Sequence, residues 1–269
     1  MGGFYNSMNF IEDIKSVDEK IHQIMEESFG ELIKSISKST FPSTGKALIT
    51  LTLKSNFIKN AIFDLCENDD LYSVSILFRS LIEHYLRQQY LFMRYAQEKN
   101  DSIGIDYYKY CNMGEDLGYI KSIKYIHKMF DDKNDFDIWG SYCSVKPEFK
   151  NLTKIERKSK VDQFNYKNII SFIWNFSKNE EVSNFLQNII LNYSELSSFV
   201  HGGPYGENMM FSNGDKKKRN KKLKNMAELS FTMAKQIKQF TYLFAYQLDT
   251  KYGSFYNRLL KSELPKVLK

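Results

Sequence analysis

Apolar residues recur at three- and four-residue steps along most of this chain, which is the spacing of amphipathic α-helices. The clearest case runs from 71 to 98. Its apolar face consists of Leu71, Val74, Phe78, Leu81, Ile82, Tyr85 and Phe92. Further helices are expected at 17–36, 47–67, 166–178, 180–201 and 220–249. No segment shows the alternation of strands and helices that is typical of an α/β sheet. The sequence therefore predicts an all-α protein built as a helical bundle.

Residues 131–162 interrupt this pattern. The segment is polar, lacks a helical period and contains Gly140 and Pro147, so we expect a long polar insertion in the middle of the bundle. Residues 1–44 are expected to form an N-terminal helical extension, because a stretch rich in Ser and Thr follows at 37–46. With 269 residues, the chain is predicted to be one all-α domain whose bundle core covers about 45–250.

Two of these helices carry a polar pair beside the apolar face. In 71–98, Arg79 and Glu83 stand four residues apart at the edge of that face. In 180–201, Ser197 and His201 have the same spacing, and the following Gly-Gly-Pro ends the helix. If the two helices pack together, these four residues converge in one polar site. A structural interpretation is also open, with an ion pair that orients one helix, which is the commoner role of such a pair, and a histidine that caps the other.

The positive charge of the chain is concentrated in one segment. The net charge is +6, and seven cations fall within 216–224. They are Lys216, Lys217, Lys218, Arg219, Lys221, Lys222 and Lys224. The rest of the chain is close to neutral, so the protein is not basic throughout. Such a cluster can contact nucleic-acid phosphates, or it can be a solvated helix start that only aids solubility.

Composition narrows the class of protein further. The apolar share of 42% and the aromatic share of 15% argue against disorder. The three cysteines are far apart, and no zinc-type or phosphate-loop motif occurs, so no metal or cofactor is expected. The N-terminus lacks the pattern of a signal peptide, and no apolar run is long enough to cross a bilayer. We therefore expect a cytoplasmic protein that does not contact a membrane.

Two short motifs carry a resemblance to a known family. The pattern FRSLIEHYLRQQYL, followed more than a hundred residues later by YSELSSFVHG, resembles an uncharacterised bacterial all-α family. That family is known only as a domain of unknown function and is distantly similar to HEPN domains. The resemblance covers roughly residues 45–250. HEPN domains are helical bundles that often form homodimers, and many are metal-independent ribonucleases of antiphage, toxin–antitoxin and CRISPR-associated systems.

The resemblance implies an RNA-cleaving effector of a bacterial defence system. His201 would act as general base or acid on a ribose 2′-OH, and Ser197 would hydrogen-bond its imidazole. The HEPN nuclease motif has an Arg a few residues before the His, and 194–200 contains none. Arg79 would therefore stabilise the pentavalent phosphate, with Glu83 as an orienting group.

Two other functions fit the same residues. One is a non-catalytic binding or adaptor subunit of a defence complex, which implies a homodimer or a partner protein. The other is an accessory protein that binds RNA or other nucleic acid through Lys216–Lys224.

Overall fold

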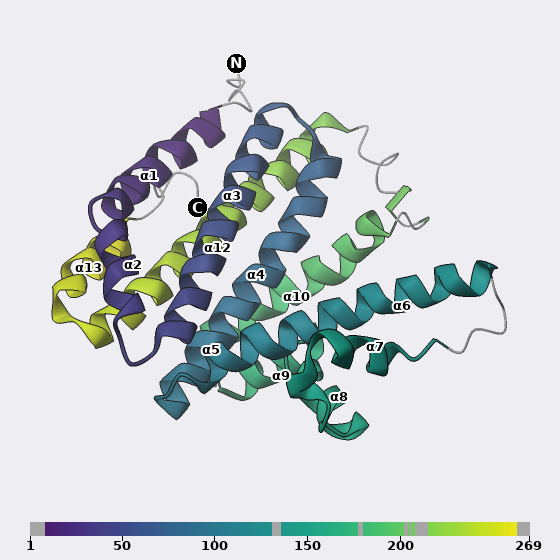
Figure 1. Ribbon diagram of the computed structural model, residues 1–269. Coiled ribbons are helices and arrows are strands. Elements are labelled where there is room, and N and C mark those ends of the chain that lie inside the picture. Colours follow the sequence, from purple (N-terminus) through teal and green to yellow (C-terminus); the bar gives the residue numbers. More distant parts are fainter. Residues whose placement is uncertain are drawn as a thin grey trace, which may run out of the picture.

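Three long helices pack against one another at the centre of the computed structural model (Figure 1). They are α3 (Pro42–Glu67), α4 (Leu71–Glu98) and α12 (Lys216–Leu248). The structure describes residues 9–130, 136–176, 180–201, 204, 206–207 and 215–262. Every element within these residues is helical, which confirms the all-α prediction for this part of the chain.

The turn between α3 and α4 shows why the predicted 71–98 helix has the bounds that the structure gives. The side chain of Asp70 accepts a hydrogen bond from the backbone N–H of Ser73 at 3.0 Å, and so caps α4. At the far end, Lys99 takes a left-handed conformation with φ of 50° and stops the helix. The helix therefore has the bounds 71–98 that the apolar pattern predicts.

The N-terminal helices belong to the same core as the central three. The predicted 17–36 helix is wrong in its bounds, because α1 (Asn9–Glu26) starts earlier and α2 (Phe29–Ser37) follows after a break. At the break, the hydroxyl of Ser28 bonds the Ile24 carbonyl oxygen and lies 2.6 Å from the Tyr242 hydroxyl on α12. This contact across the fold is invisible in local periodicity. The C-terminal elements η3 (Thr250–Tyr252) and α13 (Gly253–Lys261) pack beside α12.

Two helices cover the other side of α4. They are α9 (Tyr166–Phe176) and α10 (Glu180–Val200). Helix α10 runs antiparallel to α4, because the ring of Phe185 lies 5.9 Å from that of Tyr85, whereas the ring of Phe199 lies 6.1 Å from that of Tyr72. This order sets which predicted site residues can meet.

The middle of the chain is more helical than its composition indicates. After α5 (Ser102–Asp106) and a π-helical turn, η1 (Tyr107–Cys111), the helix α6 (Asn112–Phe130) runs outward from the bundle (Figure 1). In the predicted insertion, 136–162 forms α7 (Ile138–Val145), η2 (Pro147–Phe149) and α8 (Lys154–Asp162). Residues 131–135 lie outside the described part. These helices are too short to show a period, although the capping box of Thr153 and Glu156 marks the start of α8.

Candidate functional site

Arg79 and Glu83 meet in the structure, and the group that joins them is Tyr193 on α10. The Arg79 Nη2 donates to the Tyr193 hydroxyl oxygen at 3.1 Å, and that hydroxyl donates to the Glu83 Oε1 at 3.1 Å. The direct separation of Arg79 Nη2 and Glu83 Oε1 is 3.5 Å. The three side chains therefore form a closed triangle across the α4–α10 interface, which we call the Arg79–Glu83–Tyr193 triad.

Aromatic rings enclose the triad. The Arg79 guanidinium lies 4.9 Å from the centre of the Tyr193 ring, and the ring of Tyr166 on α9 stacks on the same tyrosine at 3.7 Å. The Arg79 side chain is only 16% exposed, and its buried Nε has no hydrogen-bond partner among the described residues. Burial, assisted by Tyr193 and Glu83, raises the pKa of Tyr166 above its usual range. The triad is a partly buried polar contact between α4 and α10, with Tyr166 of α9 packed on it.

A small cavity adjoins the triad. Its volume is about 170 Å³, and its wall includes Glu83, Arg87, Tyr166 and Tyr193. Pockets that enclose organic ligands usually measure about 300–1,000 Å³. The cavity is therefore too small for a nucleotide, and the triad is not the floor of a substrate pocket in this conformation.

Ser197 and His201 are separate from the triad. The Ser197 hydroxyl donates to the Tyr193 carbonyl oxygen at 3.1 Å, so it is bonded to its own helix. The His201 side chain is exposed and makes no hydrogen bond to another described residue, while its backbone N–H donates to the Ser197 carbonyl oxygen at 3.1 Å. His201 lies eight positions beyond Tyr193, which is about 12 Å along a helix. The four predicted residues thus do not converge: two share the triad, and His201 stands at the end of the bundle.

The basic segment begins α12 at that same end. Asp215 caps the helix by accepting from the backbone N–H groups of Lys217 and Lys218. Arg219 forms a two-pronged ion pair with Asp69 on the α3–α4 turn, with Nε to Oδ1 at 2.8 Å. Lys222 lies 3.8 Å from Glu195 of α10, which connects the start of α12 to the last turns of α10. Arg219 and Lys222 are therefore partly structural.

The remaining cations of the segment differ in whether an acidic side chain lies near them. Lys224 lies 3.8 Å from Glu228, and Lys218 lies 4.0 Å from the cap Asp215. No described acid lies within ion-pairing distance of Lys216, Lys217 or Lys221. Four lysines are exposed: Lys216, Lys217, Lys218 and Lys221. Together with His201 they form what we call the basic end of the bundle.

Tyr193 was not predicted as a polar partner, because it stands on the apolar face of its helix. A signal was nevertheless present. A buried pair of charges off the edge of a core face needs a third hydrogen-bonding group, and tyrosine supplies one at the end of an apolar ring. Sequence alone could not choose among the chain's 18 tyrosines.

Two other kinds of site are absent from the described residues. Among the described residues, no group of three or more His, Cys, Asp or Glu side chains is placed to hold a metal ion. Within the same residues, no helix combines the length and apolar character that crossing a membrane requires. No family model, curated protein or solved structure matches this chain.

Proposed function

We propose that this chain binds nucleic acid at the basic end of the bundle. The observation that supports the proposal is the cluster of four exposed lysines on the first turns of α12. The start of α12 lies against the last turns of α10, the helix that ends at His201, because Lys222 lies 3.8 Å from Glu195. Lysine contacts to phosphate oxygens give affinity that is sequence-independent and sensitive to salt. The resemblance to HEPN domains indicates RNA as the nucleic acid and bacterial defence as the setting.

The test is a binding titration of the whole chain against labelled single-stranded RNA. We expect the variant in which Lys216, Lys217, Lys218 and Lys221 are all changed to Gln to bind at least about tenfold more weakly than wild type, because four phosphate contacts are lost. The matched control changes four exposed lysines elsewhere, at Lys20, Lys34, Lys38 and Lys158, to Gln. Its net charge is identical, so only the position differs. Equal losses in the two variants would overturn the proposal.

A second candidate function is metal-independent RNA cleavage with His201 as the acid–base group. The observation in its favour is that the imidazole is exposed at the basic end and bonded to no other described residue. In this mechanism the imidazole takes the proton of a ribose 2′-OH, and the oxygen attacks the adjacent phosphorus while the 5′-oxygen leaves and takes up a proton. Arg79 is held by Tyr193, which lies about 12 Å from His201 along α10. We therefore assign the cation that stabilises the phosphate to α12.

Cleavage of total RNA in the presence of a chelator tests this second function. His201→Ala should bind RNA as wild type does and leave it intact, whereas Arg79→Ala should still cleave. If purified wild type leaves RNA intact as well, the chain is a non-catalytic binding subunit. Binding and cleavage are read separately, so one proposal can fail without the other.

A further inference from the structure

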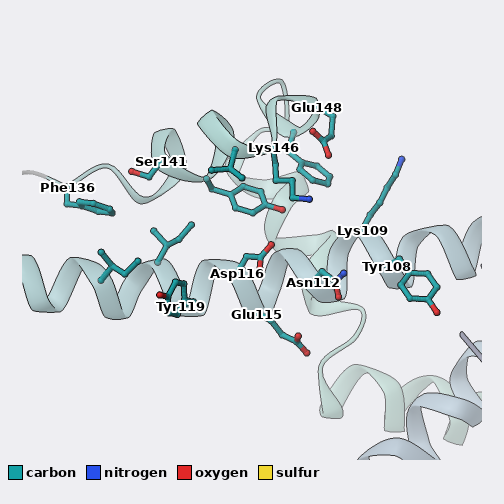
Figure 2. Close-up of a pocket in the computed structure, with 15 residues that line it drawn as sticks. Tyr108, Lys109, Asn112, Glu115, Asp116, Tyr119, Phe136, Ser141, Lys146 and Glu148 are labelled. Carbon is teal, nitrogen blue, oxygen red and sulfur yellow. The ribbon is translucent and has the colours of Figure 1, made fainter. Parts of the chain in front are cut away.

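A cavity of about 750 Å³ lies between α6 and the segment 136–149 (Figure 2), and we call it the α6 groove. Pockets that enclose organic ligands usually measure about 300–1,000 Å³. Five aromatic side chains line the groove, at Tyr108, Tyr119, Phe136, Tyr142 and Phe149. The α6 groove is therefore large enough for an organic molecule and presents aromatic rings to it.

Packing holds two of these rings in place. Tyr142 and Phe149 are buried, and their rings stack with centres 5.7 Å apart. The ring of Trp139 stacks on that of Tyr142 at 5.5 Å, and the Arg157 guanidinium lies 3.7 Å from the centre of the Trp139 ring. A ligand that contacts Tyr142 and Phe149 therefore meets rings that are already ordered, which reduces the entropic cost of binding.

Asp116 occupies the middle of the α6 wall. The residues that α6 contributes at 112, 116, 120 and 123 follow three- and four-residue steps, so they share one side of the helix. Figure 2 shows Asp116 pointing toward the segment 136–149, whereas Glu115 points to another side of the helix. The Asp116 side chain is half-buried and forms no hydrogen bond or ion pair with another described residue. A partly desolvated carboxylate without a partner favours the binding of a cation.

A second carboxylate, that of Glu148, belongs to the opposite wall. Burial, assisted by Asp116 and Glu148, raises the pKa of Tyr142 to about 12. Both carboxylates therefore act on the same phenol hydroxyl, one from each wall of the groove. A cation placed beside Tyr142 would interact with Asp116 and Glu148 together.

Two lysines, Lys109 and Lys146, also line the groove. Neither forms an ion pair with another described residue. With Glu115 included, the lining holds three carboxylates against these two ammonium groups, so one negative charge is in excess. The charge of the groove therefore complements a cation better than an anion.

The part of the groove beside the later turns of α6 is lined by apolar and aromatic side chains. They are Tyr119, Ile120, Ile123, Phe136 and Val145. Figure 2 shows Phe136 opposite these turns of the helix. A ligand that fills the groove therefore has an apolar body for this part and a charged group for the part around Asp116.

We propose that the α6 groove binds an organic ammonium ion, with the cation at Asp116 and the apolar body between Tyr119 and Phe136. The aromatic rings contribute as well, because the face of a tyrosine or phenylalanine ring attracts a cation within about 6 Å of its centre. The groove shares no residue with the basic end of the bundle, so this inference is independent of the proposed function.

The first experiment compares three probes that share one indole ring and differ in charge. Tryptamine is a cation, tryptophol is neutral and indole-3-acetate is an anion. Their dissociation constants with the full chain are measured by ligand-observed nuclear magnetic resonance. Tryptamine should bind at least about tenfold more tightly than tryptophol, and indole-3-acetate should bind most weakly. Equal binding of the three probes, a preference for indole-3-acetate, or no binding of any probe would overturn the proposal.

The second experiment locates the bound cation. Asp116→Asn should weaken tryptamine binding about tenfold and leave tryptophol binding unchanged, because only the charge contact is lost. Asp13→Asn, at an exposed carboxylate on α1, is the matched control and should bind both probes as wild type does. Lys146→Gln should instead bind tryptamine more tightly, since it removes a like charge from the lining. Tryptamine binding that is the same in wild type and Asp116→Asn would contradict the placement of the cation.

A third variant tests the apolar body. Tyr119→Ala removes a 70% exposed ring from the wall and should weaken tryptamine and tryptophol by the same factor, with no change in melting temperature. Titrations at several protein concentrations show whether a second copy of the chain fills the groove instead. A tryptamine affinity that falls as the protein concentration rises would identify that occupant and overturn the proposal.

Discussion

Two buried lysines share one aspartate where α1 meets α3 and α12. Lys59 and Lys238 are 0% and 2% exposed, and the side chain of Asp18 is 15% exposed. Lys59 forms an ion pair with Asp18, and the Lys238 Nζ lies 3.6 Å from the other carboxylate oxygen. The two ammonium groups are thus in contact with a single counter-charge. Burial of an excess charge is costly, so this cluster should make stability depend on Asp18 and on pH.

Removing the carboxylate should destabilise the fold strongly. Asp18→Asn would leave two buried cations without an anion in contact, and we expect a loss of about 3–5 kcal/mol in the free energy of unfolding at pH 7. Urea unfolding followed by circular dichroism measures it. Asp13→Asn is the control, because Asp13 is exposed on the same helix, and it should change stability by less than about 0.5 kcal/mol. Similar losses in the two variants would contradict the prediction.

Lys238, the second lysine in contact with Asp18, should destabilise the fold at neutral pH. Burial lowers the pKa of Lys238 to about 8, with Lys59 adding to the effect and Asp18 opposing it. Between this value and the ordinary 10.5, the unfolded chain binds more protons than the folded one, so this group's contribution to stability rises with pH in that window. Below about pH 8 the cost is present in full.

Lys238→Met should therefore be more stable than wild type at pH 7, by an amount on the order of 1 kcal/mol, because Asp18 keeps Lys59 as its partner. Its advantage should shrink as the pH rises from 8 to 10. Urea midpoints of both proteins across this range give the difference, in which the titration of other groups cancels. An advantage that is constant with pH would show that the folded and unfolded chains bind this proton equally, so that folding does not lower the pKa of Lys238.

The buried lysines mark what local sequence patterns do not contain. Lys59 and Lys238 occupy positions in helices that were predicted correctly as helices. Their burial arises only because α1, far away in the chain, covers α3 and α12. Local sequence predicts that a lysine lies on a helix, but whether its side chain is exposed to water depends on tertiary contacts. The same reason hid Tyr193, whose hydroxyl is polar only in relation to Arg79 and Glu83.

At the scale of elements, long periodic helices were predicted well and short ones were not. Helix α4 has a long apolar face and a cap at Asp70, so its bounds follow from local signals. Helices α7 and α8 are about two turns long. Helix α7 contacts η2 through the rings of Tyr142 and Phe149 at 5.7 Å, and it contacts α8 through Trp139 and Arg157 at 3.7 Å. Since so few turns hold no clear period, the polar segment 131–162 was predicted only as a long insertion without a helical period.

The contact between α4 and α10 predicts different effects on stability for Arg79 and His201, two of the four predicted site residues. Arg79→Ala removes the hydrogen bond and ring contact to Tyr193 and leaves Glu83 without its nearest cation, so we expect a loss of roughly 1–3 kcal/mol. His201→Ala should change stability by less than about 0.5 kcal/mol, because the side chain is exposed. Thermal unfolding of both variants measures the contrast.

Tyr193→Phe shows whether the triad acts as a unit. It keeps the ring but removes the hydroxyl that joins Arg79 to Glu83, and should cost about 1 kcal/mol. The double variant Tyr193→Phe with Arg79→Ala should lose less stability than the sum of the two single losses, since both substitutions break the same contact. Tyr246→Phe is the control, because Tyr246 is 43% exposed. Additive losses would mean that Arg79 and Tyr193 contribute independently.

At the scale of the whole molecule, the two surfaces singled out belong to different elements. The basic end is formed by α10 and α12. The exposed apolar side chains of α6 are Tyr119, Tyr125, Ile126, Met129 and Phe130. The sequence located the first, because a run of cations is visible without a structure. It did not locate the second, since the apolar residues of α6 have the period of a core-facing helix. Within the described part of the chain, α6 runs outward from the bundle (Figure 1), and its side chains on that face are exposed.

The charge distribution over the molecule determines how RNA binding should respond to salt. Of the seven cations in 216–224, Arg219 is held by Asp69, and the four exposed lysines are available for phosphates. Each phosphate neutralised on a single strand contributes about −0.7 to the slope of log K against log salt concentration. We therefore expect a slope of about −3 for wild type, measured by anisotropy between about 50 and 200 mM salt.

The quadruple Gln variant at Lys216, Lys217, Lys218 and Lys221 should lose most of that slope, whereas Arg219→Gln should instead lower the melting temperature. A slope that survives in the quadruple variant would place the phosphate contacts on another face of the molecule.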